Sequence, residues 1–516
     1  MKFFTTAGPV NPEKHYFVPH RLNAAQIEEL IEQEKYFILH APRQSGKTTA
    51  FMQLVQQLNE TGKYKALYVN IEAAQAARSD IKMGMETILD ELHDHATRYL
   101  PHDDPIFKYI KAGFKRISGL SFKKVLQAWC IASEKPIILF IDEIDALVGD
   151  TLIAVLRQIR SGYVGRPASF PQSICLIGVR DVRDYRIWSD ETKSSILGGS
   201  AFNIKAESLT LPNFSQEQVR YLYQQHTQET GQKFTDEAIE YAFQQTQGQP
   251  WLVNALAYEA CFVMVTDHTQ TITKEIINRA KETLIIRRDT HIDTLVARLN
   301  EPRVRAIIEA ILIGQDAPES FPTDDISYVI DLGLVSKHNQ RLTIANPMYQ
   351  EVIPRELSHG TQLSITQELV WYKNPDGTIN MSKLLQNFTQ FYRENSEVWL
   401  EKFDYKESGP HLLLMAFLQR IINGGGSIHR EYGLGRKRVD LLVGYATQRI
   451  VIELKILRNE KTLPDGLEQT AQYMDISNAT EGHLVIFDRS TIKNWDEKIY
   501  QRQESCTGKT ISVWGM

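Results

Sequence analysis

The chain contains 516 residues, which corresponds to three or four domains at about 150 residues per domain. Hydrophobic residues make up 42% and charged residues 23%, which are ordinary globular values and exclude a disordered or fibrous chain. The formal net charge of -5 excludes a global cationic field, so any nucleic-acid surface must be a local patch.

The four cysteines are scattered and form no C-x-x-C pair, which argues against a disulfide framework or a zinc site. The first residues lack the apolar core of a signal peptide, and no apolar run approaches the ~20 residues that span a bilayer. We therefore expect a soluble, cytoplasmic protein without a membrane partner.

Short β-rich runs alternate with amphipathic helical patterns between residues 35 and 210. The runs begin at Tyr36, Lys65, Pro136 and Ser173. This alternation predicts a parallel sheet that is covered by helices on both faces. We expect this α/β core to span residues 1–212.

The first β-rich run leads into the loop A-P-R-Q-S-G-K-T-T and then into a helix. This is the context of a P-loop, because successive backbone N–H groups and a helix N-terminus can wrap a phosphate. Ala41 replaces the first glycine of the usual motif and still permits a tight loop. Lys47 would reach the β- and γ-phosphates of ATP, and Thr48 would ligate Mg²⁺. The residues expected to contact the nucleotide are Arg43, Gln44, Ser45, Gly46, Lys47, Thr48 and Thr49.

The run P-I-I-L-F-I ends in two carboxylates, Asp142 and Glu143. Asp142 would hold magnesium through water, and Glu143 would orient or deprotonate the attacking water, which favours hydrolysis over passive binding. Alone, the pair could equally cap the following helix, but the P-loop favours the catalytic interpretation. Asp145 is expected to cap the helix that contains Thr151.

Arg180 follows the run S-I-C-L-I-G-V, at the carboxyl end of an expected strand. Ligands of parallel sheets lie at these ends, so Arg180 is a candidate sensor of the γ-phosphate. A surface ion pair is an equal alternative. Arg43 and Arg160 are weaker candidates for the same role.

An all-helical lid is expected at residues 213–300. Ser215 begins its first helix with a capping-box partner at Gln218, and further helices are expected near 235–246, 251–265 and 273–299. Gly248-Gln249-Pro250 begins one of these helices. Pro250 either closes over the adenine or is a plain first-turn proline.

Two helices and a hairpin in residues 301–355 suggest a winged helix. Residues 356–400 are interpreted as a connector that contains one helix or two and a turn at Asn374-Pro375-Asp376-Gly377. Residues 401–516 are expected to form a second, smaller α/β domain. Its pattern is a helix from His411, a glycine break, three strands, a helix and a strand.

Two of these C-terminal strands surround a short turn. One face of the second strand is apolar, which leaves Glu453 and Lys455 together on the other face. A two-residue turn at Ala446-Thr447 would place Asp440 opposite Glu453, with Cβ atoms about 5 Å apart. The two carboxylates would hold Mg²⁺ or Mn²⁺, and Lys455 would orient or deprotonate a water that cleaves a phosphodiester. The alternative is a solvent-facing cluster of charged side chains.

Several motifs in residues 1–355 together resemble the prokaryotic AAA-like ATPases related to the AAA+ and STAND groups. They are A-P-R-Q-S-G-K-T-T, L-F-I-D-E-I-D, L-I-G-V-R-D-V-R-D, F-N-I-K-A-E-S-L-T-L, G-Q-P-W-L-V-N-A-L and I-A-N-P-M-Y-Q-E-V-I. The resemblance implies a P-loop ATPase fold, a nucleotide contact by Gly248 and Pro250, and reading of the γ-phosphate by Arg180.

The order of elements in residues 400–490 resembles the PD-(D/E)XK nuclease superfamily. Gln469 and Tyr473 match the Q-x-x-x-Y element of some members, including those like Holliday-junction resolvases. The resemblance implies catalytic roles for Asp440, Glu453, Lys455 and Gln469, and it leads us to expect an additional acidic residue, for which Glu407 is the nearest candidate.

The sequence therefore predicts an ATPase that uses ATP and Mg²⁺ and controls a metal-dependent nuclease, with DNA favoured over RNA as the partner and genome maintenance or defence as the setting. The alternative is a nucleotide-driven signalling or scaffold ATPase with an inactive nuclease-like binding domain. A metabolic kinase is disfavoured, since no acceptor site is recognisable. A homo-oligomer is possible in either case.

Overall fold

The structure is a computed structural model of the whole chain. It describes residues 1–115, 117–181, 186–189, 194–197, 202–287, 291, 297–312, 321–338, 341–357, 372, 374–400, 410, 414, 417–418, 427–434, 437–445, 447–488, 490 and 493–516. The chain forms two compact units: the first unit is Met1–Ile286 with Pro322–Leu334, and the second unit is Arg287–Phe321 with Val335–Met516. Within these described ranges, none of the helices combines the length and apolarity that a bilayer crossing requires.

The first unit is built on a five-stranded parallel sheet with the strand order β2-β3-β4-β1-β7. Its strands are β1 (Tyr36–His40), β2 (Lys65–Asn70), β3 (Ile137–Asp142), β4 (Ser173–Gly178) and β7 (Lys205–Thr210). The predicted parallel α/β core is thereby confirmed. A short hairpin follows β4 and consists of β5 (Arg186–Ser189) and β6 (Ser194–Leu197).

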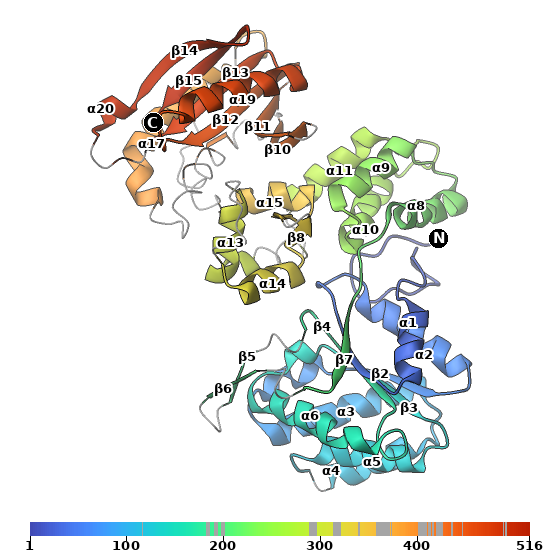
Figure 1. The fold of residues 1–516 in the computed structure, drawn as a ribbon. Coiled ribbons are helices and arrows are strands. Elements are labelled where there is room, and N and C mark those ends of the chain that lie inside the picture. The colour runs from blue at the N-terminus through green and yellow to red at the C-terminus, as the bar shows by residue number, and fades with distance from the viewer. Residues whose placement is uncertain are drawn as a thin grey trace. The chain divides into compact units, whose positions relative to one another are not determined.

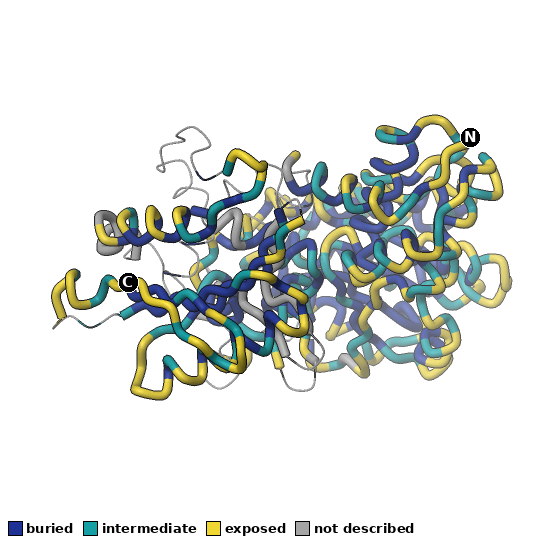
Figure 2. Tube along the Cα trace, turned by 90° about the horizontal axis from the view of Figure 1, so that it is seen from above, coloured by how far each residue is buried: buried dark blue, intermediate teal, exposed yellow. Residues whose placement is uncertain are grey.

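Helices cover both faces of this sheet (Figure 1). One face carries α1 (Ala24–Glu32) and α2 (Lys47–Glu60), and the other carries α3 (Ile81–Tyr99), α4 (Pro105–Phe114), α5 (Ser121–Ala132) and α6 (Gly149–Gly162). The central strands are buried on both faces, which explains their nearly continuous apolar sequence. Figure 2 shows buried residues along the strands and the inward sides of the helices.

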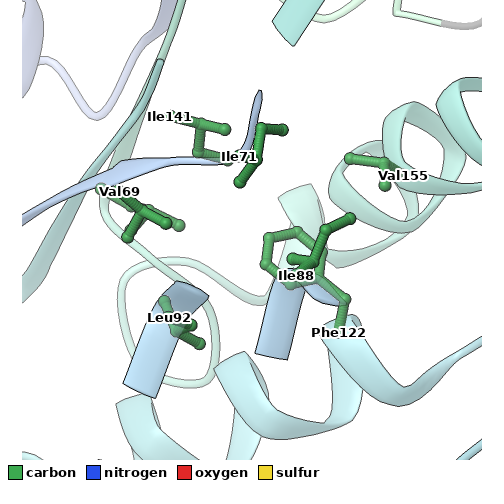
Figure 3. Close-up of a pocket in the computed structure, with 8 residues that line it drawn as sticks. Val69, Ile71, Ile88, Leu92, Phe122, Ile141 and Val155 are labelled. Atoms are coloured by element: carbon green, nitrogen blue, oxygen red, sulfur yellow. The ribbon is translucent and has the colours of Figure 1, made fainter. Parts of the chain in front are cut away.

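A wholly apolar pocket remains between the sheet and the second set of helices (Figure 3). Its lining residues are Val69, Ile71, Ile88, Leu92, Phe122, Leu139, Ile141 and Val155. The pocket presents no polar group to a ligand, so it is a packing feature of the core.

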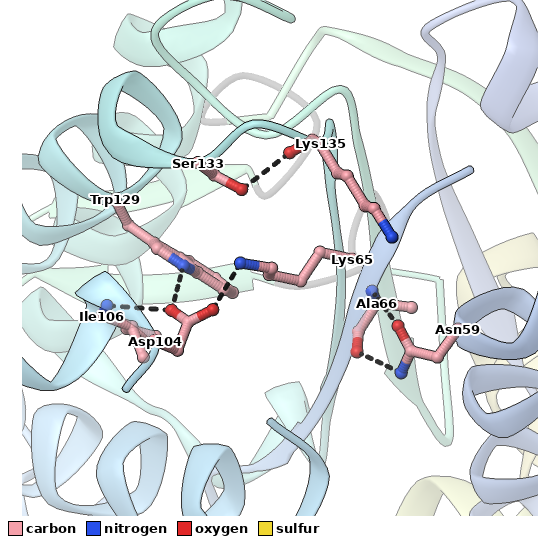
Figure 4. A network of polar contacts seen from close by, with 8 residues as sticks. All are labelled: Asn59, Lys65, Ala66, Asp104, Ile106, Trp129, Ser133 and Lys135. Carbon is pink, nitrogen blue, oxygen red and sulfur yellow. Dashed lines mark hydrogen bonds and ion pairs between the residues drawn. The ribbon is translucent and has the colours of Figure 1, made fainter. Parts of the chain in front are cut away.

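A buried carboxylate joins three elements of the first unit (Figure 4). Asp104 accepts hydrogen bonds from the backbone N–H of Ile106 and from Trp129 Nε1, both at 2.9 Å, and it pairs with Lys65 Nζ. Asp104 thereby caps α4 and ties it to α5 and to the start of β2. These bonds satisfy a charge that would otherwise be costly to bury.

The helical lid contains α8 (Gln216–Thr230), α9 (Asp236–Thr246), α10 (Pro250–Tyr258) and α11 (Lys274–Arg287). The predicted capping box is present, because Ser215 Oγ accepts from the Gln218 N–H at 3.2 Å and Gln218 Oε1 accepts from the Ser215 N–H at 3.0 Å. Of the helix expected at residues 273–299, α11 covers the part up to Arg287; His291 and residues 297–299 are also helical, and the residues between them lie outside the described residues.

The next segment has the helix, helix, hairpin order expected of a winged helix. Its elements are α13 (Pro302–Leu312), α14 (Thr323–Asp331), β8 (Val335–His338) and β9 (Arg341–Ile344), followed by α15 (Pro347–Leu357). The hairpin strands pair antiparallel. The segment that contains α14 belongs to the first unit, and the rest belongs to the second.

The second unit contains a six-stranded mixed sheet in the order β10-β11-β12-β13-β15-β14. Its strands are β10 (Ser427–Leu434), β11 (Lys437–Tyr445), β12 (Gln448–Ile456), β13 (Glu481–Phe487), β14 (Tyr500–Cys506) and β15 (Lys509–Gly515). The pairs β12–β13 and β13–β15 are parallel, and the other pairs are antiparallel. Strands β14 and β15 were not predicted from the sequence pattern.

Helices α17 (Met381–Leu400) and α19 (Thr462–Ser477) pack on opposite faces of this sheet, and the short helix α20 (Trp495–Lys498) follows β13. The stretch expected as a connector contains a helix, as predicted, but this helix belongs to the core of the second unit, because Leu384, Leu385 and Phe388 of α17 are buried with sheet residues. Most of the helix expected from His411, and Glu407, lie outside the described residues.

Candidate functional site

The loop before α2 has the backbone conformation that phosphate binding needs. Gln44 and Gly46 have left-handed φ values of 56° and 84°, which curl the loop tightly. Gly46 is the N-cap of α2, and no side chain caps this helix. The N–H groups of its first turn thus remain available to an anion, which the positive end of the helix also favours.

Two side chains of this loop also fit a phosphate. Lys47 is 6% exposed, and its Nζ donates to the carbonyls of Ala41 at 2.8 Å and Pro42 at 3.0 Å. Burial lowers the pKa of Lys47, while nearby carboxylates oppose that shift. Ser45 Oγ is buried without a hydrogen-bond partner, which costs about 1–3 kcal/mol. A phosphate oxygen in the loop would satisfy this hydroxyl.

Asp142 is fully buried at the end of β3, and three donors hold its carboxylate. Its Oδ2 accepts hydrogen bonds from Thr48 Oγ1 at 3.2 Å and from the Tyr68 hydroxyl. Its Oδ1 accepts from the Glu143 N–H at 2.8 Å. Burial raises the pKa of Asp142, and these hydrogen bonds and Lys47 oppose the shift. The loop, β2 and β3 therefore converge on one carboxylate.

Glu143 lies beside this cluster in an unusual backbone conformation. Its φ of 58° and ψ of 40° are left-handed, which costs a residue with a side chain of the order of 1 kcal/mol or more. Burial and then the charge of Asp142 raise the pKa of Glu143. A half-buried carboxylate with a raised pKa is suited to accept a proton from water.

Arg180 and its neighbours contact helix α14. The Arg180 guanidinium lies 4.8 Å from the ring centroid of Tyr328. His40 Nδ1, at the end of β1, lies 3.3 Å from Asp331 Oδ1. A Cβ atom added to Gly333 would lie 2.7 Å from Pro42 Cγ. Helix α14 and the turn that follows it are therefore packed against the start of the P-loop and the ends of β1 and β4.

The expectation that Asp145 caps the next helix is wrong. Asp145 Oδ2 accepts a hydrogen bond from the Val179 N–H at 2.6 Å, so this carboxylate ties the segment after β3 to the end of β4. Helix α6 begins later, at Gly149, with Val148 at its N-cap.

The lid and the N-terminal segment both reach the P-loop. Gln249 Nε2 donates to the Gln44 carbonyl at 3.5 Å, and Pro250 is the first residue of α10. Val10 donates its N–H to Thr49 Oγ1 at 3.1 Å. Both segments thus contact the P-loop, and Pro250 follows directly after the lid residue that does so.

Sequence reasoning missed Arg21 and Tyr68. Arg21 donates to the carbonyl of Ser45 in the P-loop and, at 2.6 Å, to that of Pro212 in the segment before the lid. Its guanidinium also lies 4.6 Å from the Phe214 ring centroid, and burial lowers its pKa to about 10. Neither residue belongs to a motif, and only the fold brings them to the site.

The C-terminal carboxylate and lysine occupy the strand positions that were predicted. Glu453 is 2% exposed, and Lys455 Nζ lies 2.7 Å from Glu453 Oε1. Tyr445 pairs with Gln448, so the turn has two residues as expected. Leu441 pairs with Ile452, and the same register continued by one residue would place Asp440 opposite Glu453. The side chain of Asp440 lies outside the described residues.

Helix α19 covers the face of β12 from which Glu453 projects, since Val451 packs with α19 and Ile450 and Ile452 pack on the other face. Gln469 is half-buried on α19, and Tyr473 is buried. Among the side chains that the structure describes, no three His, Cys, Asp or Glu groups gather as a metal site.

Comparisons with known proteins bear on both units. The family model described as an AAA-like domain matches residues 5–354, and a domain of unknown function (DUF8371) matches residues 383–491. No curated protein matches the chain.

Three solved structures illustrate the structural similarity. A Walker-type ATPase of Pyrococcus abyssi has 14% identity, with 68% of this chain and 99% of that chain covered and a TM-score of 0.48. The RuvB Holliday junction branch migration motor of Thermotoga maritima has 13% identity, coverage of 64% and 94%, and a TM-score of 0.33. Cdc6p from Pyrobaculum aerophilum has 12% identity, coverage of 67% and 96%, and a TM-score of 0.35.

Proposed function

Because the chain belongs to the AAA-like domain family, we propose that its first unit binds and hydrolyses ATP at the P-loop. The observation that carries this proposal is the convergence of Thr48, Asp142 and Glu143 beside the uncapped start of α2. A phosphate-binding loop, a magnesium-binding carboxylate and a second acid are the parts that ATP hydrolysis requires.

The backbone N–H groups from Gln44 to Thr49 hold the phosphates, and Lys47 exchanges its two carbonyl partners for phosphate oxygens. Thr48 and Asp142 would hold Mg²⁺, which supplies charge neutralisation at the phosphates. The Arg43 side chain and Pro250 complete the nucleotide site.

Glu143 orients the attacking water and accepts its proton, as its raised pKa favours. Arg180 senses the γ-phosphate, and to reach it the Arg180 guanidinium moves away from the Tyr328 ring. ATP binding would in this way loosen the contact between α14 and the core.

The test compares Glu143→Gln with the wild-type protein, using the exposed Glu60→Gln as a matched control. Glu143→Gln should retain Mg²⁺-ATP binding and lose about 10²- to 10⁴-fold in turnover, because the proton acceptor is removed while the phosphate contacts remain. Wild-type protein that releases no phosphate from Mg²⁺-ATP, or a Glu143→Gln variant with full turnover, would contradict the proposal.

A second activity is proposed for the second unit: metal-dependent cleavage of nucleic-acid phosphodiester bonds, with DNA favoured over RNA. The β11–β12 register favours it, because one further step would bring Asp440 opposite Glu453, which already pairs with Lys455. Asp440 and Glu453 would hold Mg²⁺ or Mn²⁺, Lys455 would orient the water, and Gln469 would assist from α19.

Cleavage is tested on labelled single-stranded, duplex and branched DNA and RNA with Mg²⁺ or Mn²⁺, with and without ATP. Wild-type protein should cut at least one form, and Glu453→Gln should not, while the exposed Glu460→Gln should cut normally. If no form is cut, and light scattering shows oligomers that require ATP, the scaffold ATPase with an inactive binding domain is the correct function.

A further inference from the structure

We propose that Tyr68 is a positioning residue that holds the Asp142 carboxylate in place for Mg²⁺ and thereby sets the Mg²⁺ concentration that nucleotide binding requires. This inference rests on the proposed ATP-binding function. Tyr68 lies on β2, next to the strand that carries Asp142, and its hydroxyl donates a hydrogen bond to Asp142 Oδ2.

The Tyr68 ring is fixed by packing on both strands and helices. Its side chain is 2% exposed in the core beneath α2, where Phe140 of β3 is its partner in the register. The His95 ring packs against it at 5.6 Å between centroids and 67° between planes. His95 Nε2 in turn accepts the N–H of Asn70 at 3.3 Å. A ring held in this way presents its hydroxyl at one defined position.

Packing of the ring does not explain why residue 68 carries a hydroxyl group. A buried hydroxyl costs free energy unless it is hydrogen-bonded, and a phenylalanine would fill the same apolar space. The carboxylate of Asp142 is the partner that offsets this cost, since a hydrogen bond to a charged acceptor is stronger than one between neutral groups.

Tyr68 and Thr48 both donate to Asp142 Oδ2, but their hydrogen bonds have different roles. Thr48 is itself a proposed magnesium ligand: its hydroxyl oxygen would bind the metal through a lone pair while its proton is donated to Asp142, so this bond is part of the metal site itself. The Glu143 N–H holds only Oδ1. Tyr68 is the one of these three donors that belongs neither to the proposed metal ligands nor to the backbone, and its bond to Oδ2 keeps the carboxylate from rotating about its bond to Cβ.

The variant Tyr68→Phe removes one oxygen atom and leaves the packing intact. Loss of a group that orients a metal ligand typically weakens metal affinity by about 10- to 100-fold. We expect the Mg²⁺ concentration for half-maximal binding of a fluorescent ATP analogue to rise by about that factor in the full-length protein. Binding at saturating Mg²⁺ should recover to the wild-type level.

Tyr36→Phe is the matched control. Tyr36 is 0% exposed on β1 of the same sheet, and its hydroxyl donates to the Pro171 carbonyl at 2.8 Å, away from the metal-binding carboxylate. Its removal should leave the Mg²⁺ titration unchanged. Thermal unfolding of both variants establishes that each is folded, and Mn²⁺ electron paramagnetic resonance with the ATP analogue measures the metal affinity directly.

An unchanged Mg²⁺ requirement in Tyr68→Phe would overturn the inference. Equal shifts in Tyr68→Phe and Tyr36→Phe would also overturn it, since they would indicate a general loosening of the sheet. A wild-type protein that binds no nucleotide at any Mg²⁺ concentration is a separate outcome, because it refutes the proposed ATP site itself and with it the role of Tyr68.

Discussion

The two proposed sites are assembled in different ways. The site of the first unit draws Thr48, Tyr68 and Asp142 from three elements that are far apart in the sequence. The site proposed for the second unit would draw Glu453 and Lys455 from one strand and Asp440 from its hairpin neighbour. Alternation along a strand alone puts Glu453 and Lys455 on one face. Convergence of distant residues is the more specific sign of a function.

The largest expected effect is on the two activities, which substitutions at the two sites should remove independently of each other. Lys47→Ala should lower ATP turnover by about 10³-fold or more, because it removes a buried cation that would face the phosphates. Lys455→Ala should leave phosphate release unchanged and abolish metal-dependent cleavage. A phosphate-release assay and a cleavage assay on both variants check this. Loss of ATP turnover in Lys455→Ala would mean that the two sites are not independent.

The second expected effect is on the stability of the first unit. Asp104→Ala removes the α4 cap, the Trp129 bond and the partner of Lys65, and should destabilise the first unit by about 3 kcal/mol. Calorimetry should show a lower transition for the first unit and an unchanged one for the second. Equal shifts of both transitions would show that the units do not unfold separately.

The third effect should be confined to the second unit and depends on pH. His291 is buried, with Nε2 2.5 Å from the Tyr349 hydroxyl, and burial lowers its pKa to about 4 from 6.5. The unfolded chain therefore binds the proton more readily, so the stability that neutral His291 contributes is complete above pH 6.5 and is lost as the pH falls towards 4.

The expected loss is about 2 kcal/mol at pH 5, at 1.36 kcal/mol per pKa unit. Unfolding midpoints measured between pH 7 and pH 4 should fall less steeply in His291→Gln than in the wild-type protein. Parallel pH profiles for the two proteins would contradict this prediction.

The smallest effect concerns the contact of α14 with the P-loop. Gly333 and Gly377 have nearly equal φ values of 76° and 82°, so alanine at either position costs about 1 kcal/mol in backbone strain. Only at Gly333 would the new Cβ meet a neighbour, Pro42. Hydrogen exchange of α14 should therefore accelerate in Gly333→Ala and not in Gly377→Ala. Equal exchange in the two variants would show that the contact contributes little.

Local patterns were sufficient to predict much of the fold. The apolar runs from Tyr36 and Ser173 became parallel strands, Ser215 and Gln218 formed their capping box, and the two-residue turn after Tyr445 set the β11–β12 register. The formation of each strand, the capping box and the turn depends on residues that are close together in the sequence. Periodicity and capping residues can be recognised at that range.

Long-range contacts were not predictable in the same way. In the sequence, Tyr68 looks like one more residue of an apolar strand, and only the fold shows that Asp142 of β3 lies next to its hydroxyl. Arg21 belongs to no motif, and only the fold shows that it contacts the P-loop. Asp145 resembles a helix cap, but the end of β4 offers its Val179 N–H instead. The amphipathic pattern of α17 predicts a helix and does not say which sheet will bury it.

The position of β1 between β4 and β7 has a consequence for synthesis of the protein. Its partners β4 and β7 are made much later, with Phe37 paired to Cys175 and Tyr36 to Lys205, whereas β10, β11 and β12 pair with their neighbours along the chain. Bringing distant segments together is slow and costs chain entropy. The strand that leads into the P-loop thus gains its second neighbour only after Thr210 has left the ribosome. A nucleotide that binds only the folded P-loop would therefore stabilise the finished unit and would contribute nothing while its early strands are being made.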